Sequence, residues 1–180
     1  MKVINLFGGP GSGKSTTAAA AFAMMKNMGL RVELVTEYAK DLTYEKGDLT
    51  NQLSILGEQD RRLRRLLGQV DYVVTDSPLL LGLMYASGSF SAPWFTSAAL
   101  GAFGSYDNVN FLLRRVKPYA TYGRGQTEDE AKVIDERTRC LLVGIGYPFE
   151  TVDGDEFAAS TIIHAVTQGG QVGQQSSLPT

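Results

Sequence analysis

A stretch near the start of the chain, FGGPGSGKST, constrains its fold more than any other feature. Residues 8–15 match the pattern G-x-x-x-x-G-K-[ST] at every fixed position, and the apolar run Val3 to Phe7 in front of them suits a buried strand. Glycines let the backbone curl so that successive N–H groups point inward at phosphate oxygens, and a helix that follows adds the positive end of its dipole. The stretch therefore predicts the phosphate-binding loop of a P-loop NTPase.

This loop predicts ATP and Mg²⁺ as cofactors. Lys14 is expected to reach the β and γ phosphates, and the Ser15 hydroxyl is expected to bind the magnesium ion. The residues expected to contact ATP are Gly9, Pro10, Gly11, Ser12, Gly13, Lys14, Ser15 and Thr16. A chance glycine-rich turn is the ordinary alternative, but it would not require a lysine and a hydroxyl at fixed positions between a strand and a helix.

The rest of the chain alternates between segments typical of strands and of helices. Short apolar runs predict strands at 3–7, 31–36, 70–75, 108–113 and 149–152. Apolar periodicity and alanine content predict helices at 15–28, 53–67, 127–144 and 156–168, and Thr127 with Glu130 forms a capping box. This order predicts an α/β protein with a three-layer α/β/α P-loop NTPase fold and a five-stranded, mostly parallel sheet.

Two segments fit this alternation less well. Residues 87–107 are small, aromatic and almost uncharged, which suits a hydrophobic helix, a pocket wall or a partner surface. Residues 169–180 consist mainly of Gly, Gln and Ser, and we expect them to form a disordered tail. Residues 1–168 are accordingly expected to form a single domain, and the sequence leaves a homodimer open.

Composition excludes several classes of protein. The formal net charge of -2 gives no global basic field for nucleic-acid binding, although a local basic patch stays open. Cys140 is the only cysteine, which excludes an internal disulfide and a metal site built from cysteines. The sequence has no apolar stretch of the ~20 residues that a membrane span needs, and its start lacks a signal-peptide pattern. We therefore expect a cytoplasmic protein without membrane contact.

Two acidic residues end predicted strands and are expected to face the nucleotide. Asp76 follows the run YVVT, and Glu37 follows RVELVT. In open α/β sheets, ligands bind in the crevice outside the carboxyl ends of the strands. We expect Asp76 to hold Mg²⁺ directly or through water, and Glu37 to accept a proton from an acceptor hydroxyl or to orient it. The ordinary alternatives are a common strand-end aspartate and a solvated glutamate.

Residues around Glu37 and on the helix 53–67 are candidates for binding the acceptor. Gln59 could hydrogen-bond a base edge, and Arg62 could hold an acceptor phosphate. A solvated helix face is the ordinary explanation for most arginines of this helix. The residues expected to bind the acceptor are Glu37, Tyr38, Lys40, Gln59 and Arg62.

A basic segment, residues 114–127, lies between a predicted strand and a capped helix, where a closing lid would be placed. Its cations are Arg114, Arg115, Lys117 and Arg124. They would neutralise charge on a transferring phosphoryl group, and closure would exclude water. The residues expected to be catalytic are Lys14, Glu37, Asp76, Arg114 and Arg124.

The segments TEYAKDL, TDSPLLL and RRVKPY...GRGQTEDEA follow the phosphate loop in this order. Together they resemble small phage-type P-loop kinases related to thymidylate and nucleoside kinases, over most of residues 1–165. The resemblance implies that Glu37 lies beside the acceptor and that Arg114, Arg115 and Arg124 are lid arginines. Asp76-Ser77-Pro78 departs from the Asp-Arg-Tyr or Asp-Arg-Trp usual in thymidylate kinases and from the Glu-Arg-Ser of deoxynucleoside kinases.

One similar branch phosphorylates 5-hydroxymethyluracil within phage DNA, which prepares the base for thymidine hypermodification. This resemblance implies a host-cell cytoplasmic enzyme that takes a flipped base into its pocket, where Phe90, Trp94, Phe95 and Phe103 could stack on it or wedge the duplex. We favour this acceptor, and phosphorylation of free deoxynucleotides or nucleosides is the alternative. A GTPase is excluded because no Asn-Lys-x-Asp guanine reader is present. A nucleotide-binding module without catalysis stays open.

Overall fold

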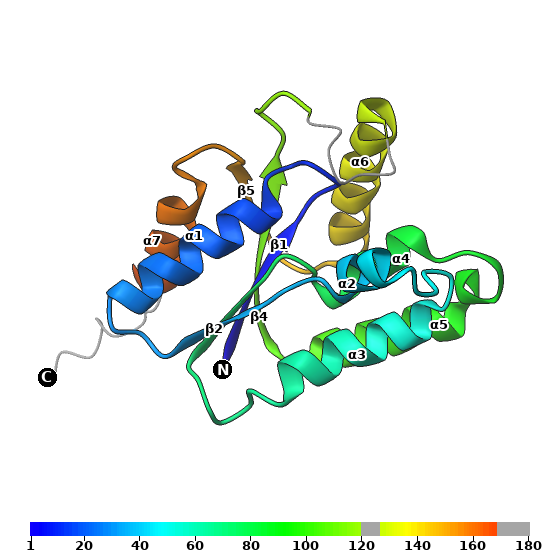
Figure 1. Cartoon of the computed structure of the whole chain (residues 1–180), viewed down its shortest axis with the longest axis horizontal. Coiled ribbons are helices and arrows are strands. Elements are labelled where there is room, and N and C mark those ends of the chain that lie inside the picture. The colour runs from blue at the N-terminus through cyan, green and yellow to red at the C-terminus, as the bar shows by residue number, and fades with distance from the viewer. Residues whose placement is uncertain (120–126, 169–180) are drawn as a thin grey trace, which may run out of the picture.

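The computed structural model describes residues 1–119 and 127–168, and its centre is a five-stranded sheet with strand order β2-β3-β1-β4-β5 (Figure 1). All strand pairs are parallel. The strands are β1 (Lys2–Phe7), β2 (Val32–Val35), β3 (Tyr72–Thr75), β4 (Asp107–Arg114) and β5 (Glu150–Asp153). The predicted three-layer α/β fold is confirmed, and the sheet is entirely rather than mostly parallel.

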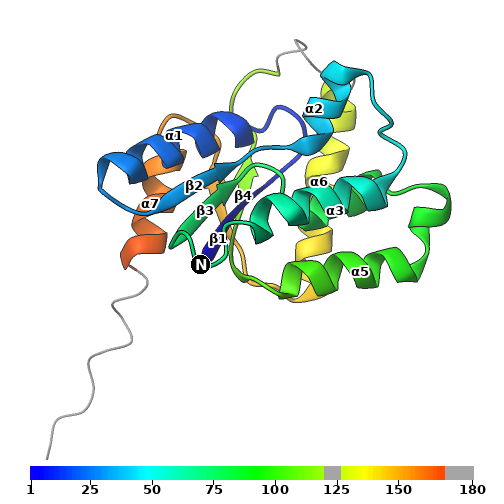
Figure 2. The same cartoon turned by 60° about the horizontal axis from the view of Figure 1, so that its bottom comes forward.

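Helices cover both faces of this sheet. The α-helices are α1 (Lys14–Asn27), α2 (Tyr38–Glu45), α3 (Gln52–Arg64), α4 (Gly82–Tyr85), α5 (Pro93–Gly104), α6 (Glu128–Ile145) and α7 (Ala158–Gln168), and the 3₁₀ turns are η1 (Leu79–Leu81) and η2 (Gly88–Ser91). In Figures 1 and 2, α1 and α7 lie on one face, and α3, α5 and α6 lie on the other. This arrangement leaves the carboxyl ends of the strands open between the layers.

Two apolar cores explain the layers. Ile4 and Leu6 of β1 pack with residues of α1 and α7, whereas Val3 and Phe7 pack with residues of α3, α5 and α6. Alternate side chains of a strand point to opposite faces, so a strand buried on both faces reads as a continuous apolar run. The central strand β1 is such a run, and this is why its sequence predicts it so clearly.

The segment 87–107, whose role was open, is mainly the helix α5, which begins with Pro93 at its amino end. Phe95 and Phe103 are buried in the core. The hypothesis that these two rings stack on a base is therefore wrong, because both faces of each ring are already covered by protein. Trp94 keeps 47% of its surface exposed and contacts the rings of Phe90 and Phe95.

The sequence missed the short helices α2 and α4. α2 has only eight residues and none of them is fully buried, so it gives a weak apolar pattern in the sequence. Arg124 and the predicted tail, 169–180, lie outside the described residues, as does the centre of the segment 114–127. Within the described ranges, no helix combines the length and apolar character needed to cross a membrane.

Candidate active site

The loop between β1 and α1 has the geometry that its glycines predict. Gly8, Gly11 and Gly13 have φ angles of 138°, 77° and 100°, a region that side chains other than glycine rarely adopt. The Thr17 N–H donates to the Gly13 carbonyl at 2.9 Å and begins α1 directly behind the loop. The loop therefore presents backbone amides and a helix amino terminus to the same space, as an anion site requires.

Lys14 lies folded over this loop. Its Nζ donates to the carbonyl oxygens of Gly8 and Gly9, at 2.6 and 2.9 Å. Burial lowers the pKa of this ammonium, while Glu37, Asp76 and Asp135 oppose the shift. The lysine thus lies where three carboxylates from three different elements converge. A phosphate oxygen would offer the Lys14 ammonium a full negative charge, whereas its two carbonyl partners carry only partial negative charges.

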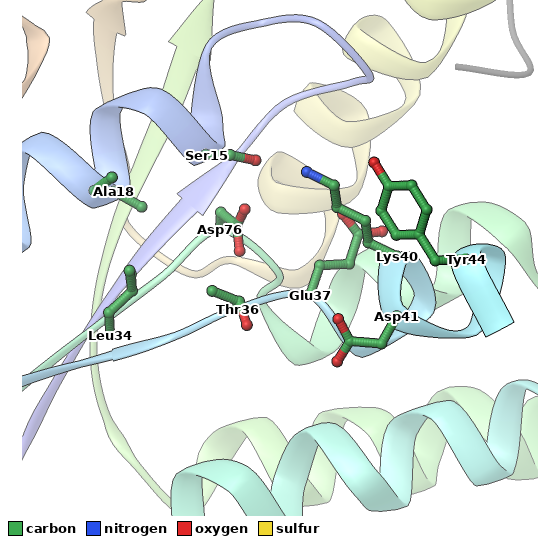
Figure 3. A pocket seen from close by; sticks show the side chains of 10 residues that line it. Ser15, Ala18, Leu34, Thr36, Glu37, Lys40, Asp41, Tyr44 and Asp76 are labelled. Carbon is green, nitrogen blue, oxygen red and sulfur yellow. The ribbon is translucent and has the colours of Figure 1, made fainter. Parts of the chain in front are cut away.

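Asp76 and Ser15 lie on one side of a pocket of about 290 Å³, and Glu37, Lys40 and Tyr44 lie on the other (Figure 3). Asp76 follows β3 and is 4% exposed, and its Oδ1 has no hydrogen-bond partner among the described residues. A buried carboxylate oxygen without a partner is costly, and a cation satisfies it. With the Ser15 hydroxyl on the same side of the pocket, these residues fit Mg²⁺, which typically takes only one or two protein carboxylates and completes its shell with phosphates and water.

Glu37 connects β2 to α2 and lines the same pocket. Burial is the main cause that raises the pKa of its carboxyl group, and Asp76 and Asp41 raise it further, whereas Lys14 and Lys40 lower it. A carboxylate with a raised pKa is a better proton acceptor than an ordinary surface carboxylate. The pocket therefore lies at the end of the phosphate loop and is lined by residues that fit a metal ion, Ser15 and Asp76, and by a carboxyl group suited to accept a proton, that of Glu37.

The family model of an AAA domain, AAA_28, matches residues 3–158. The chain belongs to this family of AAA domains. No curated protein sequence matches it. Solved structures show the fold: deoxyadenosine kinase from M. mycoides, with dCMP and a flexible dCDP bound, has a TM-score of 0.50 and 19% identity, over 96% of this chain and 99% of that one. Shikimate kinase from Aquifex aeolicus has a TM-score of 0.49 and 16% identity, over 96% of this chain and 100% of that one.

The fold of this AAA domain is thus a P-loop kinase-like α/β fold, in which the site lies at the carboxyl ends of the strands. Gln59 and Arg62 of α3, which are expected to bind the acceptor, contact the turn between β2 and α2. The Gln59 amide is bonded to the backbone of Thr36 and Tyr38. Arg62 pairs with Asp41 at 2.7 Å and with Glu58 at 3.1 Å. Contact of either side chain with an acceptor stays a prediction.

Arg114, the last residue of β4, and Arg115, which follows it, diverge in this AAA domain. Arg114 forms an ion pair with Asp153 at the end of β5 and is largely exposed. Arg115 turns the other way: its Nη2 donates to the Pro10 carbonyl at 2.8 Å and to Asp135 at 2.9 Å. Its Nη1 is buried without a partner in the described part of the chain. Arg115, rather than the expected Arg114, therefore lies against the phosphate loop.

Asp135 is a residue of this site that sequence reasoning missed. It projects from α6 and accepts a hydrogen bond from the Gly9 N–H at 2.5 Å while it pairs with Arg115. Several acidic residues precede and follow it in α6, and its helical position alone does not distinguish it from them. Only the packing of α6 beside the loop gives this carboxylate its partners.

Proposed function

We propose that this chain is an ATP-dependent kinase that transfers the γ-phosphoryl group of ATP to an acceptor hydroxyl. The observation that carries the proposal is the convergence of Lys14, Asp76 and Glu37 at the open end of the phosphate loop, with the pKa of Glu37 raised mainly by burial. A module that only binds a nucleotide has no need of a half-buried carboxyl group with a raised pKa beside the pocket. A kinase needs one, because the acceptor hydroxyl must lose its proton.

Each residue then has a defined part in the transfer. The loop amides and the Lys14 ammonium bind the β and γ phosphates, and Lys14 exchanges its carbonyl partners for phosphate oxygens. Ser15 and Asp76 would hold Mg²⁺, which neutralises phosphate charge and orients the γ-phosphoryl group. Glu37 takes the proton of the acceptor hydroxyl as its oxygen bonds to the γ-phosphorus, and the bond from that phosphorus to the ADP oxygen breaks.

Arg115 is the cation best placed to stabilise charge on the phosphates. It lies against the loop, its side chain is only 10% exposed, and its free Nη1 can donate to an oxygen. The lid role expected of Arg114 and Arg124 stays a prediction. Of these two, Arg114 is engaged with Asp153.

The charges around the pocket favour an acceptor whose reacting group is a neutral hydroxyl. Glu37, Asp41 and Asp76 line the pocket, and Lys40 is the cation among its described lining residues. Arg62, which would hold an acceptor phosphate, is already neutralised by two carboxylates. An acceptor that reacts at its own phosphate would bring further negative charge against these groups.

The charge argument supports an acceptor that reacts through a hydroxyl. On the resemblance to phage-type kinases, we propose that this acceptor is a pyrimidine deoxynucleotide, and specifically the hydroxymethyl group of 5-hydroxymethyluracil in DNA. A free nucleoside, which also offers a neutral hydroxyl, is the second candidate on the same charge argument. Phosphorylation of free deoxynucleoside monophosphates at their phosphate is disfavoured.

The test supplies ATP labelled at the γ-phosphorus and Mg²⁺ with four acceptors in parallel: DNA that contains 5-hydroxymethyluracil, ordinary DNA, deoxynucleoside monophosphates and nucleosides. We expect label in the modified DNA alone. Label in nucleosides alone would establish the second candidate, and label in monophosphates would refute the charge argument. Binding of ATP without label in any acceptor would favour the non-catalytic module.

A further inference from the structure

Gln59 of α3 lies directly behind the turn that carries Glu37. Its side chain is 3% exposed. Its Oε1 accepts a hydrogen bond from the Tyr38 N–H at 3.0 Å, and its Nε2 donates to the Thr36 carbonyl at 3.2 Å. One buried amide thus bridges the backbone groups on both sides of Glu37.

The helix α2 depends on attachments of this kind. None of its residues is fully buried, and Tyr38, Ala39 and Leu42 are its half-buried apolar residues, so apolar packing alone gives it a weaker anchor than the core helices have. Glu37 occupies the N-cap of α2 but its side chain makes no capping hydrogen bond. The Tyr38 N–H, one of the donors that a helix leaves unpaired at its amino end, is accepted by Gln59 instead. The Glu37 carboxylate is therefore not used to cap the helix, while Gln59 holds the backbone beside Glu37 in place.

A second residue of α3 reinforces the same turn. The Arg62 guanidinium lies over the Tyr38 ring at 5.0 Å from its centroid and pairs with Asp41 in the first turn of α2. Arg62 also donates to the Thr36 carbonyl, at 3.4 Å, a longer contact than the 3.2 Å bond from Gln59. Gln59 additionally accepts from the Tyr38 N–H, so it holds the main chain on both sides of Glu37. Gln59 is therefore the group that most directly fixes the backbone position from which the Glu37 side chain extends.

We infer that Gln59 is a positioning residue that acts through Glu37 and does not contact the acceptor. The inference rests on the proposed function, since it requires that Glu37 accept the proton. The consequence for rate is large because a displacement of about 1 Å in a reacting group can cost about 100-fold in rate. The glutamine amide supplies both a donor and an acceptor, and both are needed to hold a carbonyl and an N–H from one side chain.

The experiment compares four variants of the full chain: Gln59→Met, Glu37→Gln, the double variant, and Gln52→Met as a matched control. Gln52 is also a buried glutamine of α3 bonded to a backbone carbonyl, that of Leu49, away from Glu37. The readouts are kcat and the KM for ATP with the acceptor that the labelling assay identifies, calorimetric binding of ATP, and thermal unfolding.

Gln59→Met is expected to lower kcat about 10- to 100-fold with an unchanged KM for ATP, and to cause no further loss in the Glu37→Gln background. The control is expected to keep the wild-type kcat. Full activity of Gln59→Met, or a loss that adds in full to that of Glu37→Gln, would overturn the inference while the proposed function stands. Full activity of Glu37→Gln would instead overturn Glu37 as the base in the proposed function.

Should Gln59→Met fail to fold, Gln59→Glu is the second variant: it keeps an acceptor for the Tyr38 N–H, loses the donor to Thr36 and adds a second carboxyl group behind the turn of Glu37. Its kcat is then expected to lie between those of the wild type and Glu37→Gln. A kcat equal to that of the wild type would contradict the inference in this variant too.

Discussion

Asp135 accepts a hydrogen bond from the Gly9 N–H at 2.5 Å, although 126 positions separate the two residues in the sequence. Through this contact the helix α6 holds the outer side of the phosphate loop. The approach is so close that a side-chain carbon at Gly9 would lie 2.7 Å from the Asp135 carboxylate and from the Ala131 carbonyl. The close packing of α6 therefore requires a glycine at position 9.

Asp135→Ala should destabilise the folded chain at the phosphate loop and weaken the binding of ATP. The substitution leaves the Gly9 N–H and the largely buried Arg115 guanidinium without their carboxylate, and each lost partner of a buried polar group costs about 1–3 kcal/mol. We expect a lower free energy of unfolding by about that amount in denaturant titrations, together with weaker calorimetric binding of ATP. Asp129→Ala, at a 97% exposed side chain on the same helix, is the control and should change neither quantity.

Glu37→Gln should lower phosphate transfer and yet stabilise the folded chain at neutral pH. Loss of the base is expected to reduce kcat by about 10²- to 10⁴-fold. The pKa of Glu37 is raised in the folded state, so folding favours its protonated form, and that contribution to stability is lost as the pH rises through the folded pKa. The amide carries no charge at any pH and avoids this loss.

Unfolding of the wild type and of Glu37→Gln across the acidic to neutral range measures this effect. The variant should be the more stable of the two at neutral pH, and the difference should shrink as the pH falls below the pKa of Glu37. A variant less stable than the wild type at neutral pH would contradict a raised pKa.

Asp76→Asn should weaken the binding of Mg²⁺ without abolishing the fold. The amide fills the same space, and it removes the negative charge of the unpartnered buried oxygen. Loss of a direct or water-mediated metal contact is expected to raise the Mg²⁺ concentration at half-maximal activity by about 10- to 100-fold. A titration of activity with Mg²⁺ at saturating ATP measures this change, and an unchanged midpoint would remove Asp76 from the metal site.

Gly154→Ala should disturb the phosphate loop from the turn after β5, at Ser12. A side-chain carbon at Gly154, in the turn after β5, would collide with the Ser12 carbonyl, which is backbone and cannot move aside cheaply. Overpacking of this kind typically costs about 1–3 kcal/mol, and we expect weaker ATP binding as well as a lower melting temperature. Gly144→Ala is the matched control, because it lies in α6 with nothing within 4 Å. It should keep ATP binding and should not lower the melting temperature, since alanine favours a helix more than glycine does.

The sequence by itself determined the parts of this protein that depend on local chemistry. The loop 8–15 has its glycines, lysine and serine within one turn of chain, and the apolar runs of β1 and β3 need no distant partner to be identified as buried strands. Asp76 and Glu37 were found because the end of a parallel strand is a position that the sequence shows directly. These residues line one pocket in the structure, as the order of the strands predicts.

Tertiary structure alone decided which side chains support those residues. Asp135 and Arg115 meet the loop because α6 packs beside it. Gln59 bonds to the turn of Glu37 because α3 passes behind α2, a helix with no fully buried residue. The sequence showed Gln59 as a polar residue on a basic helix and gave no sign that its amide was occupied. Hydrogen bonds between segments far apart in the chain depend on distances of a few tenths of an ångström, and such distances are set by the packing of whole elements.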